Sequence, residues 1–455
     1  MVQSIPHPRT SWKIIALATF LAASNYMSFS FGKYTTLFSE YMKINNFPAT
    51  VQPCAAHPCG NHTVTNTSVV ALAPFLRGAD IAATDEAAPI GRPLSKPKFT
   101  QPSPHLWANV PVIPPHTGHK KVLVTGAAGF IGSHVANALL ERGDEVIIVD
   151  EMNDYYDVKV KEGNLNLLHE KAKEMAHKHS KKEEDYLKFY RGDINNQTLM
   201  KAIFEDHKPH WVCHLAARAG VRPSIIDPLL YVRANVQGTA NMLEYSREYN
   251  VTNVVVASSS SVYGESESTY FSEAEDVNEP VSPYASTKRS GEIMSYTYHK
   301  LYALNITNLR FFTVYGPRGR PDMAPYKFVD RITRGVEIQK FGDGTTSRDY
   351  TYIDDIVDGV VRSIDRPYGY QIVNLGKGSG TKLNEFISLI EKHVGRKARI
   401  KLMPAQMGDV PFTNADVSKA NRLLGYSSKV TVEEGIRRTV EWFKETFGED
   451  GMGTA

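Results

Sequence analysis

The chain has 455 residues, of which 42% are hydrophobic and 22% are charged, which is ordinary globular composition. Its formal net charge of +3 gives no indication of a nucleic-acid partner. Three cysteines are too few for a disulfide framework. Cys54 and Cys59 are either a pair in an oxidising compartment or two unrelated thiols, and Cys213 falls inside an apolar strand.

The N-terminal region contains an uncharged, mainly apolar run at residues 14–31, preceded by Arg9 and Lys13. A membrane-spanning helix needs about 20 such residues. Basic residues on the N-terminal side favour a cytosolic N-terminus. We therefore expect residues 1–31 to be a cytosolic tail and a type II membrane anchor. A cleaved signal peptide, an organellar transit segment and a buried helix are the alternatives.

Residues 32–118 are rich in Pro, Ala, Ser and Thr and show no sustained hydrophobic period. This composition is typical of a flexible stem. Asn61 and Asn66 each begin a glycosylation sequon within it. Two sequons in a stem that follows a hydrophobic run fit a secretory route.

A strand–turn–helix–strand pattern begins after the stem. Residues 120–125 form a short β-branched strand, and the turn that follows carries Gly126, Gly129 and Gly132. An apolar-periodic helix and a second strand at 145–150 complete a βαβ unit. Glycines let a turn approach a pyrophosphate closely, and the helix N-terminus offers N–H donors to it. The pattern predicts a dinucleotide site.

Asp150 ends the second strand, about 20 residues after the turn, where an acidic side chain accepts hydrogen bonds from ribose hydroxyls and favours NAD over NADP. Further strands are predicted at 187–193, 211–217 and 254–261. His214, inside one of them, is interpreted as a packed strand histidine. The predicted cofactor-binding residues are Gly126, Gly129, Phe130, Ile131, Gly132, Asp150, Asp193, Ile194, Ala216, Tyr284 and Lys288.

A helix is predicted to begin at Ser282, because serine is a good N-cap and Pro283 suits the first helical position. Tyr284 and Lys288 then lie one turn apart on the same face. A phenol has an ordinary pKa of about 10, and a neighbouring ammonium would lower it by stabilising the phenolate. The sequence therefore predicts a tyrosine base beside a nicotinamide cofactor.

These motifs resemble the extended short-chain dehydrogenase/reductase family over about residues 119–447. Within that family, the segments Asp150–Asp157, Leu309–Ala324 and Arg348–Asp355 closely resemble those of UDP-glucuronate 4-epimerases. An N-terminal anchor followed by a lumenal catalytic region resembles the plant-type Golgi members. The resemblance implies a Golgi membrane location, with a secreted or cytoplasmic protein as the alternative.

The resemblance also implies roles for individual residues. Catalysis would fall to Tyr284, Lys288 and Ser259. The sugar carboxylate would be held by Ser260, Ser261, Thr313 and Arg320. The uridine diphosphate would contact Asn235, Lys327, Arg348 and Asp409. This chain departs from the expected pattern at Arg218 and Arg233, where less basic residues are expected.

The activity implied is C4 epimerisation of UDP-glucuronate to UDP-galacturonate, through a 4-keto sugar and tightly held NAD. A neutral UDP-glucose 4-epimerase and a UDP-glucuronate decarboxylase are the alternatives among enzymes. A catalytically silent NAD-binding scaffold is the alternative from another class, although such proteins typically lose the tyrosine, the lysine or the serine.

The fold expected is a doubly wound parallel α/β sheet of Rossmann type at 119–310. A smaller nucleotide-sugar-binding lobe at 311–447 is interleaved with the last strands, and 448–455 form a tail. The resemblance further implies a homodimer that pairs helices near 230–247 and 286–303.

Overall fold

The computed structural model of the chain describes residues 98–404 and 410–448. The apolar run at 14–31, Cys54, Cys59 and the two stem sequons lie outside these residues, so the anchor, pairing and glycosylation interpretations stay predictions. Among the helices within the described ranges, none combines the length and apolar character that a bilayer crossing requires.

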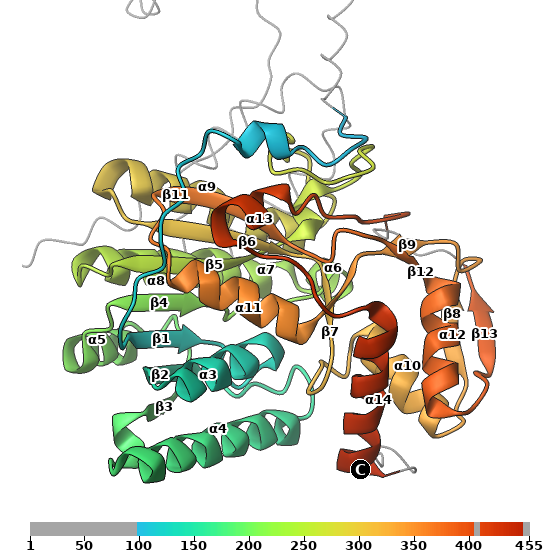
Figure 1. The fold of residues 1–455 in the computed structure, drawn as a ribbon, viewed down its shortest axis with the longest axis horizontal. Coiled ribbons are helices and arrows are strands. Elements are labelled where there is room, and N and C mark those ends of the chain that lie inside the picture. Colours follow the sequence, from blue (N-terminus) through green and yellow to red (C-terminus); the bar gives the residue numbers. More distant parts are fainter. Residues whose placement is uncertain (1–97, 405–409, 449–455) are drawn as a thin grey trace, which may run out of the picture. The chain divides into compact units, whose positions relative to one another are not determined.

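A seven-stranded sheet forms the centre of the fold, and all its strands are parallel, which confirms the predicted doubly wound architecture (Figure 1). The strand order is β11-β6-β5-β4-β1-β2-β3. The strands are β1 (Lys121–Thr125), β2 (Glu145–Asp150), β3 (Leu187–Arg191), β4 (Trp211–His214), β5 (Asn253–Ser259), β6 (Ile306–Phe311) and β11 (Tyr370–Leu375).

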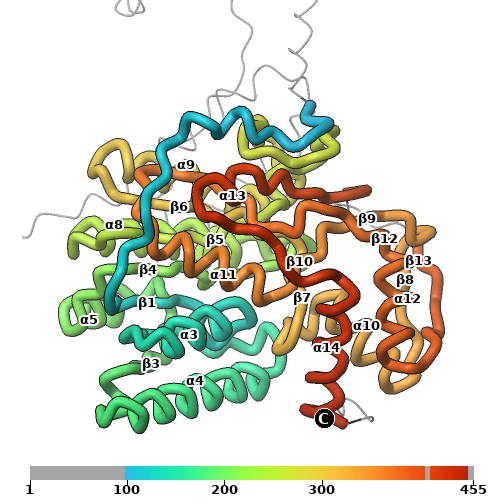
Figure 2. Tube along the Cα trace, viewed as in Figure 1, coloured from blue at the N-terminus to red at the C-terminus, as the bar shows by residue number. Residues whose placement is uncertain are grey.

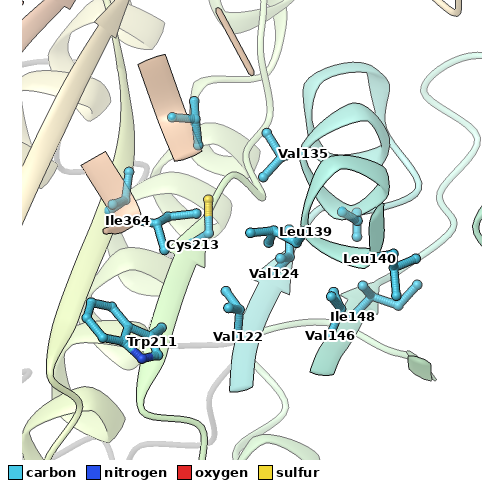
Figure 3. Packing of buried hydrophobic residues seen from close by; sticks show 14 of the residues in the cluster. Val122, Val124, Val135, Leu139, Leu140, Val146, Ile148, Trp211, Cys213 and Ile364 are labelled. Atoms are coloured by element: carbon cyan, nitrogen blue, oxygen red, sulfur yellow. The ribbon is translucent and has the colours of Figure 1, made fainter. Parts of the chain in front are cut away.

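Helices cover both faces of this sheet, because alternate residues of each buried strand point to opposite sides. Val122 and Val124 pack on one face with Leu139, whereas Leu123 packs on the other with Phe204 (Figure 3 shows the first face). The first face carries α3 (Phe130–Arg142), α4 (Val158–His179) and α11 (Ile353–Ile364). The second carries α5 (Gln197–His207), α8 (Gly238–Glu248) and α9 (Pro283–Tyr302).

Short elements connect these layers near the carboxyl ends of the strands. They are α6 (Val221–Ile226), α7 (Pro228–Tyr231) and the π-helical turn η5 (Val232–Gln237) between β4 and α8, and η6 (Ser260–Tyr263) after β5. At the opposite edge, η4 (Glu183–Asp185) precedes β3. Cys213 is fully buried in β4, which confirms its prediction as a core residue.

The C-terminal lobe lies beside the main sheet, with α10, α12 and α14 close together (Figure 2). A second cluster of buried apolar residues, including Ile332, Phe386, Ile390, Val440 and Phe443, forms its core. Its elements are β7 (Thr313–Tyr315), α10 (Ala324–Thr333), β8 (Ile338–Phe341), β9 (Ser347–Arg348), β10 (Tyr350–Tyr352), β12 (Thr381–Lys382), α12 (Leu383–Val394), β13 (Ile400–Met403) and α14 (Val432–Phe447). Helix α13 (Ser418–Leu424) instead packs on the first face of the main sheet. Strand β11 returns to the main sheet, as the interleaved arrangement predicts.

Residues 98–118 correct the predicted stem boundary, because they pack on the α/β fold. The N–H of Ser103 donates to Asp416 Oδ2 at 2.7 Å, and that of Ile113 donates to the Tyr368 hydroxyl at 3.0 Å. The short helix η3 (Pro104–Trp107) lies here, and the Lys419 ammonium sits 4.5 Å from the Trp107 ring centroid. Backbone donors hold this segment, so its lack of hydrophobic period concealed it in the sequence.

Candidate active site

A cavity of about 390 Å³ opens at the carboxyl ends of the central strands. The chain runs outward from β1 through β2 to β3, then crosses back to β4 on the other side of β1. Such a reversal leaves a crevice where ligands bind in doubly wound sheets. The predicted residues lining it are Gly126, Gly129, Phe130, Ile131, Gly132, Asp150, Asp193, Ile194, Ala216, Ser259, Ser260, Ser261, Tyr284, Lys288, Thr313 and Arg320.

The packing of the glycine turn leaves no room for a Cβ at Gly126 or Gly132. Gly126 has a φ of +72°, and a Cβ there would lie 2.7 Å from the Ala216 backbone. A Cβ on Gly132 would lie 2.1 Å from the Gly126 carbonyl oxygen. Gly129 caps the start of α3, whose first residues, Phe130 and Ile131, line the cavity. The helix N-terminus and the bare turn fit a pyrophosphate.

A fixed carboxylate lies beside this turn. Asp150 accepts hydrogen bonds from the N–H groups of Ala128 at 3.1 Å and Met152 at 2.9 Å. These bonds hold its carboxylate at the cavity wall with lone pairs left for ribose hydroxyls. The turn, the helix N-terminus and Asp150 together fit a dinucleotide cofactor of the NAD type.

The side chains predicted to be catalytic converge on the same cavity. Ser282 accepts a hydrogen bond from the Ala285 N–H at 3.1 Å, so α9 begins as predicted and Tyr284 and Lys288 share one face. Ser259 ends β5 and is hydrogen-bonded to Tyr284. The Lys288 ammonium donates to the Ala257 carbonyl at 2.7 Å. Strand β5 and helix α9 therefore bring the three residues together.

The surroundings of Tyr284 shift its pKa in both directions. Burial raises the pKa of the Tyr284 phenol, while its hydrogen bond with Ser259 and the positive charge of Arg320 lower it. The neighbouring Tyr155 adds to the effect of burial. Burial also lowers the pKa of Lys288 to about 8. Among the protein's own groups, Ser259 and Arg320 lower the pKa of the Tyr284 phenol, which is the effect expected of Lys288.

The residues predicted to hold a sugar carboxylate lie on one wall of the cavity. Ser260, Ser261 and Thr313 present hydroxyls there, and the Ser259 hydroxyl donates to the Ser261 Oγ at 3.2 Å. The Arg320 side chain is only 18% exposed, so it belongs to the cavity wall and not to the open surface. Its guanidinium donates to Asp322 at 2.9 Å and lies over the Tyr155 ring.

Three of the four predicted uridine diphosphate contacts, Asn235, Lys327 and Arg348, do not line the cavity. The Asn235 amide is buried and bonded to the backbone of Arg218 and the Thr287 hydroxyl. Lys327 is exposed on α10, and Arg348 lies in β9, where it donates to the Ser347 carbonyl. Asp409 falls outside the described residues. Their contact with a nucleotide stays a prediction.

His214 confirms its interpretation as a packed strand residue. It is 2% exposed, and its ring nitrogens face the hydroxyls of Thr125 at 2.8 Å and Thr239 at 3.2 Å. Burial lowers its pKa to about 3, so it stays neutral at physiological pH.

Sequence reasoning missed several side chains of the cavity wall. The largest are Tyr155, Tyr156, Lys161, Arg218 and Arg233. The tyrosines lie in the loop after β2 and Lys161 lies in the first turns of α4, and only the tertiary fold shows that they face the cavity. The two arginines did carry a signal, since each departs from the pattern expected at its position.

Comparison with known proteins agrees with this geometry. The sequence profile of the GDP-mannose 4,6 dehydratase family matches residues 123–439. A UDP-glucuronate 4-epimerase of Thermodesulfobacterium geofontis is 46% identical over 324 residues, which cover 71% of this chain and 96% of that protein. The UDP-glucuronate 4-epimerase 4 of Arabidopsis thaliana is 40% identical over 353 residues, 73% of this chain and 77% of that protein.

A solved structure is also similar. The UDP-glucuronic acid 4-epimerase of Bacillus cereus, crystallised with UDP-glucuronic acid and NAD, is 36% identical with a TM-score of 0.65, covering 72% of this chain and all of that one. Bacterial and plant relatives match alike, so the similarity does not single out the plant-type form. The chain belongs to the extended short-chain dehydrogenase/reductase family of NAD-dependent epimerases and dehydratases, as a UDP-glucuronate 4-epimerase-like member.

Proposed function

We propose that this chain, an NAD-dependent epimerase by its family, interconverts UDP-glucuronate and UDP-galacturonate by inverting C4 of the sugar. The observation that carries the proposal is one cavity wall. Tyr284 and Ser259 stand there next to the hydroxyls of Ser260 and Ser261 and the guanidinium of Arg320. A proton-transfer pair thus adjoins a set of donors suited to a carboxylate.

Tyr284 is the proposed base for the C4 hydroxyl. Bound NAD supplies the acceptor that takes the C4 hydrogen with its electron pair and later gives it back. The Tyr284 oxygen takes the hydroxyl proton, with the Ser259 hydroxyl as its hydrogen-bond partner. Because burial raises the pKa of Tyr284, the nearby charge of Arg320 matters for reaching the phenolate.

The second proposed task of the site is to protect the keto sugar. A 4-ketone next to a C5 carboxylate is a β-keto acid, and it loses CO₂ when the C5–C6 bond aligns with the carbonyl π system. Charge-assisted hydrogen bonds that hold the carboxylate away from that alignment prevent the loss. Ser260, Ser261, Thr313 and Arg320 are the proposed carboxylate ligands.

This proposal is tested by identifying the product from UDP-glucuronate and from UDP-glucose separately. UDP-galacturonate from the first, with poor turnover of the second, supports it. A UDP-pentose would indicate a decarboxylase, efficient turnover of UDP-glucose a neutral epimerase, and no turnover with cofactor bound a silent scaffold. Arg320→Ala should impair turnover of UDP-glucuronate more than NAD binding, and unchanged turnover would remove Arg320 from the site.

Two further proposals concern the setting of the enzyme. We propose a homodimer through α9 and its neighbours, supported by exposed apolar side chains such as Leu229 at 77%, Ile293 at 51% and Leu301 at 66%. We also propose a Golgi type II anchor at residues 14–31. Sedimentation of the purified protein tests the first, and protease protection of the C-terminus in intact vesicles tests the second.

A further inference from the structure

Two arginines line the cavity and have no part in the chemistry proposed above. Arg218 forms an ion pair with Glu151 at 3.0 Å, and Arg233 pairs with Asp193. All four residues lie on the cavity wall. The Arg218 side chain is the more enclosed of the two arginines, at 14% exposed against 56% for Arg233.

The Arg218–Glu151 pair bridges the cofactor end of the sheet. Glu151 directly follows β2, and Arg218 comes shortly after β4. Strand β1 lies between β2 and β4, and the glycine turn leaves β1 at its carboxyl end. The Arg218–Glu151 ion pair joins the loops on either side of β1. It therefore crosses the carboxyl edge of the sheet, where the glycine turn begins. It lies next to Asp150, the predicted ribose ligand.

The backbone of Arg218 is held in place before any ligand binds. Its N–H donates to the Asn235 Oδ1 at 2.8 Å, and its carbonyl accepts from the Asn235 Nδ2 at 2.9 Å. The same Nδ2 donates to the Thr287 hydroxyl on α9 at 3.0 Å. Asn235 thus ties the loop after β4 to the helix that carries Tyr284 and Lys288.

The Arg218 guanidinium has one N–H donor that its ion pair with Glu151 does not use. The Arg218 Nε is buried and finds no hydrogen-bond partner among the described residues. A buried donor without a partner is costly and calls for a ligand. Lys161, another enclosed cation of the cavity wall, differs in having a partner, since its ammonium donates to the Asn153 carbonyl at 2.8 Å. An anionic group in the cavity would satisfy the Arg218 Nε.

We propose that Arg218 is a cofactor-retaining residue: it donates from Nε to the pyrophosphate of bound NAD, while its ion pair with Glu151 closes over the cofactor and slows its release. Guanidinium is suited to both tasks, because its planar set of donors can serve a carboxylate and a phosphate at once. The inference goes beyond the proposed function, since it concerns retention of NAD and holds for any sugar substrate.

The test measures how fast bound, radiolabelled NAD⁺ exchanges with excess unlabelled NAD⁺, with no UDP-sugar present. Arg218→Gln should accelerate exchange about tenfold or more, as expected for the loss of a charge-assisted hydrogen bond. Arg218→Lys should also accelerate it, because lysine can keep the pair with Glu151 but has no Nε donor. Glu151→Gln should have a smaller effect. Arg437→Gln, which breaks an exposed pair on α14, is the matched control and should leave exchange unchanged.

Varying the salt concentration tests the electrostatic part of the proposal. Exchange from the wild type should quicken with rising ionic strength, and Arg218→Gln should lose most of that dependence. Unchanged exchange in both Arg218 variants would overturn the proposal. A raised KM for the UDP-sugar with NAD exchange unaltered would do the same, because Arg218 would then serve the substrate. Should Arg218→Gln fail to fold, the lysine variant and Glu151→Gln decide the question.

Discussion

Replacing Lys288 with methionine should stabilise the cofactor-free protein while it removes activity. The lysine is 8% exposed, and burial lowers its pKa from 10.5 to about 8. Each pKa unit corresponds to about 1.4 kcal/mol, so holding the ammonium in the fold costs about 3 kcal/mol at pH 7. The methionine variant also loses the hydrogen bond to the Ala257 carbonyl, which offsets about 1 kcal/mol of the gain in stability. We expect a net gain of about 2 kcal/mol.

The dependence on pH gives this prediction its sharpest form. The folded state disfavours the protonated amine, so the destabilisation is complete below pH 8 and disappears as pH rises from 8 towards 10.5. At pH 9.5 the cost of Lys288 falls to about 1 kcal/mol. The advantage of the methionine variant should therefore shrink by about 2 kcal/mol between pH 7 and 9.5.

Urea unfolding of cofactor-free protein at the two pH values measures both quantities. Lys300→Met is the control, because Lys300 is exposed on the same helix and its replacement should give no comparable change with pH. A variant less stable than the wild type at pH 7, or an advantage that does not shrink at pH 9.5, would refute the account of Lys288 as a costly buried ammonium.

Two further substitutions test the packing beneath the site. Gly132→Ala places a Cβ 2.1 Å from the Gly126 carbonyl oxygen. It should lower the free energy of unfolding by about 2–4 kcal/mol and abolish NAD binding. In the control Gly143→Ala, the new Cβ meets open space at φ +92°, so the loss should be about 1 kcal/mol and NAD should still bind. Calorimetry with and without NAD compares them, and equal effects would contradict the steric argument. Glu292→Gln leaves the buried Arg310, 1% exposed, without its charged partner. Urea unfolding should show a loss of about 3–5 kcal/mol in the free energy of unfolding. A loss below about 1 kcal/mol would show that the ion pair is dispensable.

The sheet and the cofactor turn were predictable because their signals are local. Strand β2 occupies the predicted residues 145–150, and α9 begins at its predicted N-cap, Ser282. Both depend on neighbours within a few positions. The βαβ rhythm also places the carboxyl ends of the strands at one edge, so the meeting of Tyr284 and Ser259 at the cavity could be expected.

The sequence could not reveal the contacts between distant loops. Arg218 and Glu151 belong to loops whose meeting depends on the crossing from β3 back to β4. The direction of the Lys288 amine depends on the Ala257 carbonyl of β5. Asn235, whose nucleotide contact stays a prediction, also bonds to the backbone of Arg218, which the sequence did not indicate. In each case the side chain has several chemically reasonable partners, and the tertiary fold selects one.

The most direct measurement follows the hydrogen at C4 of the sugar. The full chain is given UDP-glucuronate that carries deuterium at C4, and the UDP-galacturonate formed is analysed by mass spectrometry and NMR. If Tyr284 takes only the hydroxyl proton and the cofactor returns the same hydrogen, the deuterium stays at C4 of the product. Deuterium lost to solvent, or a product without its carboxylate, would contradict the account.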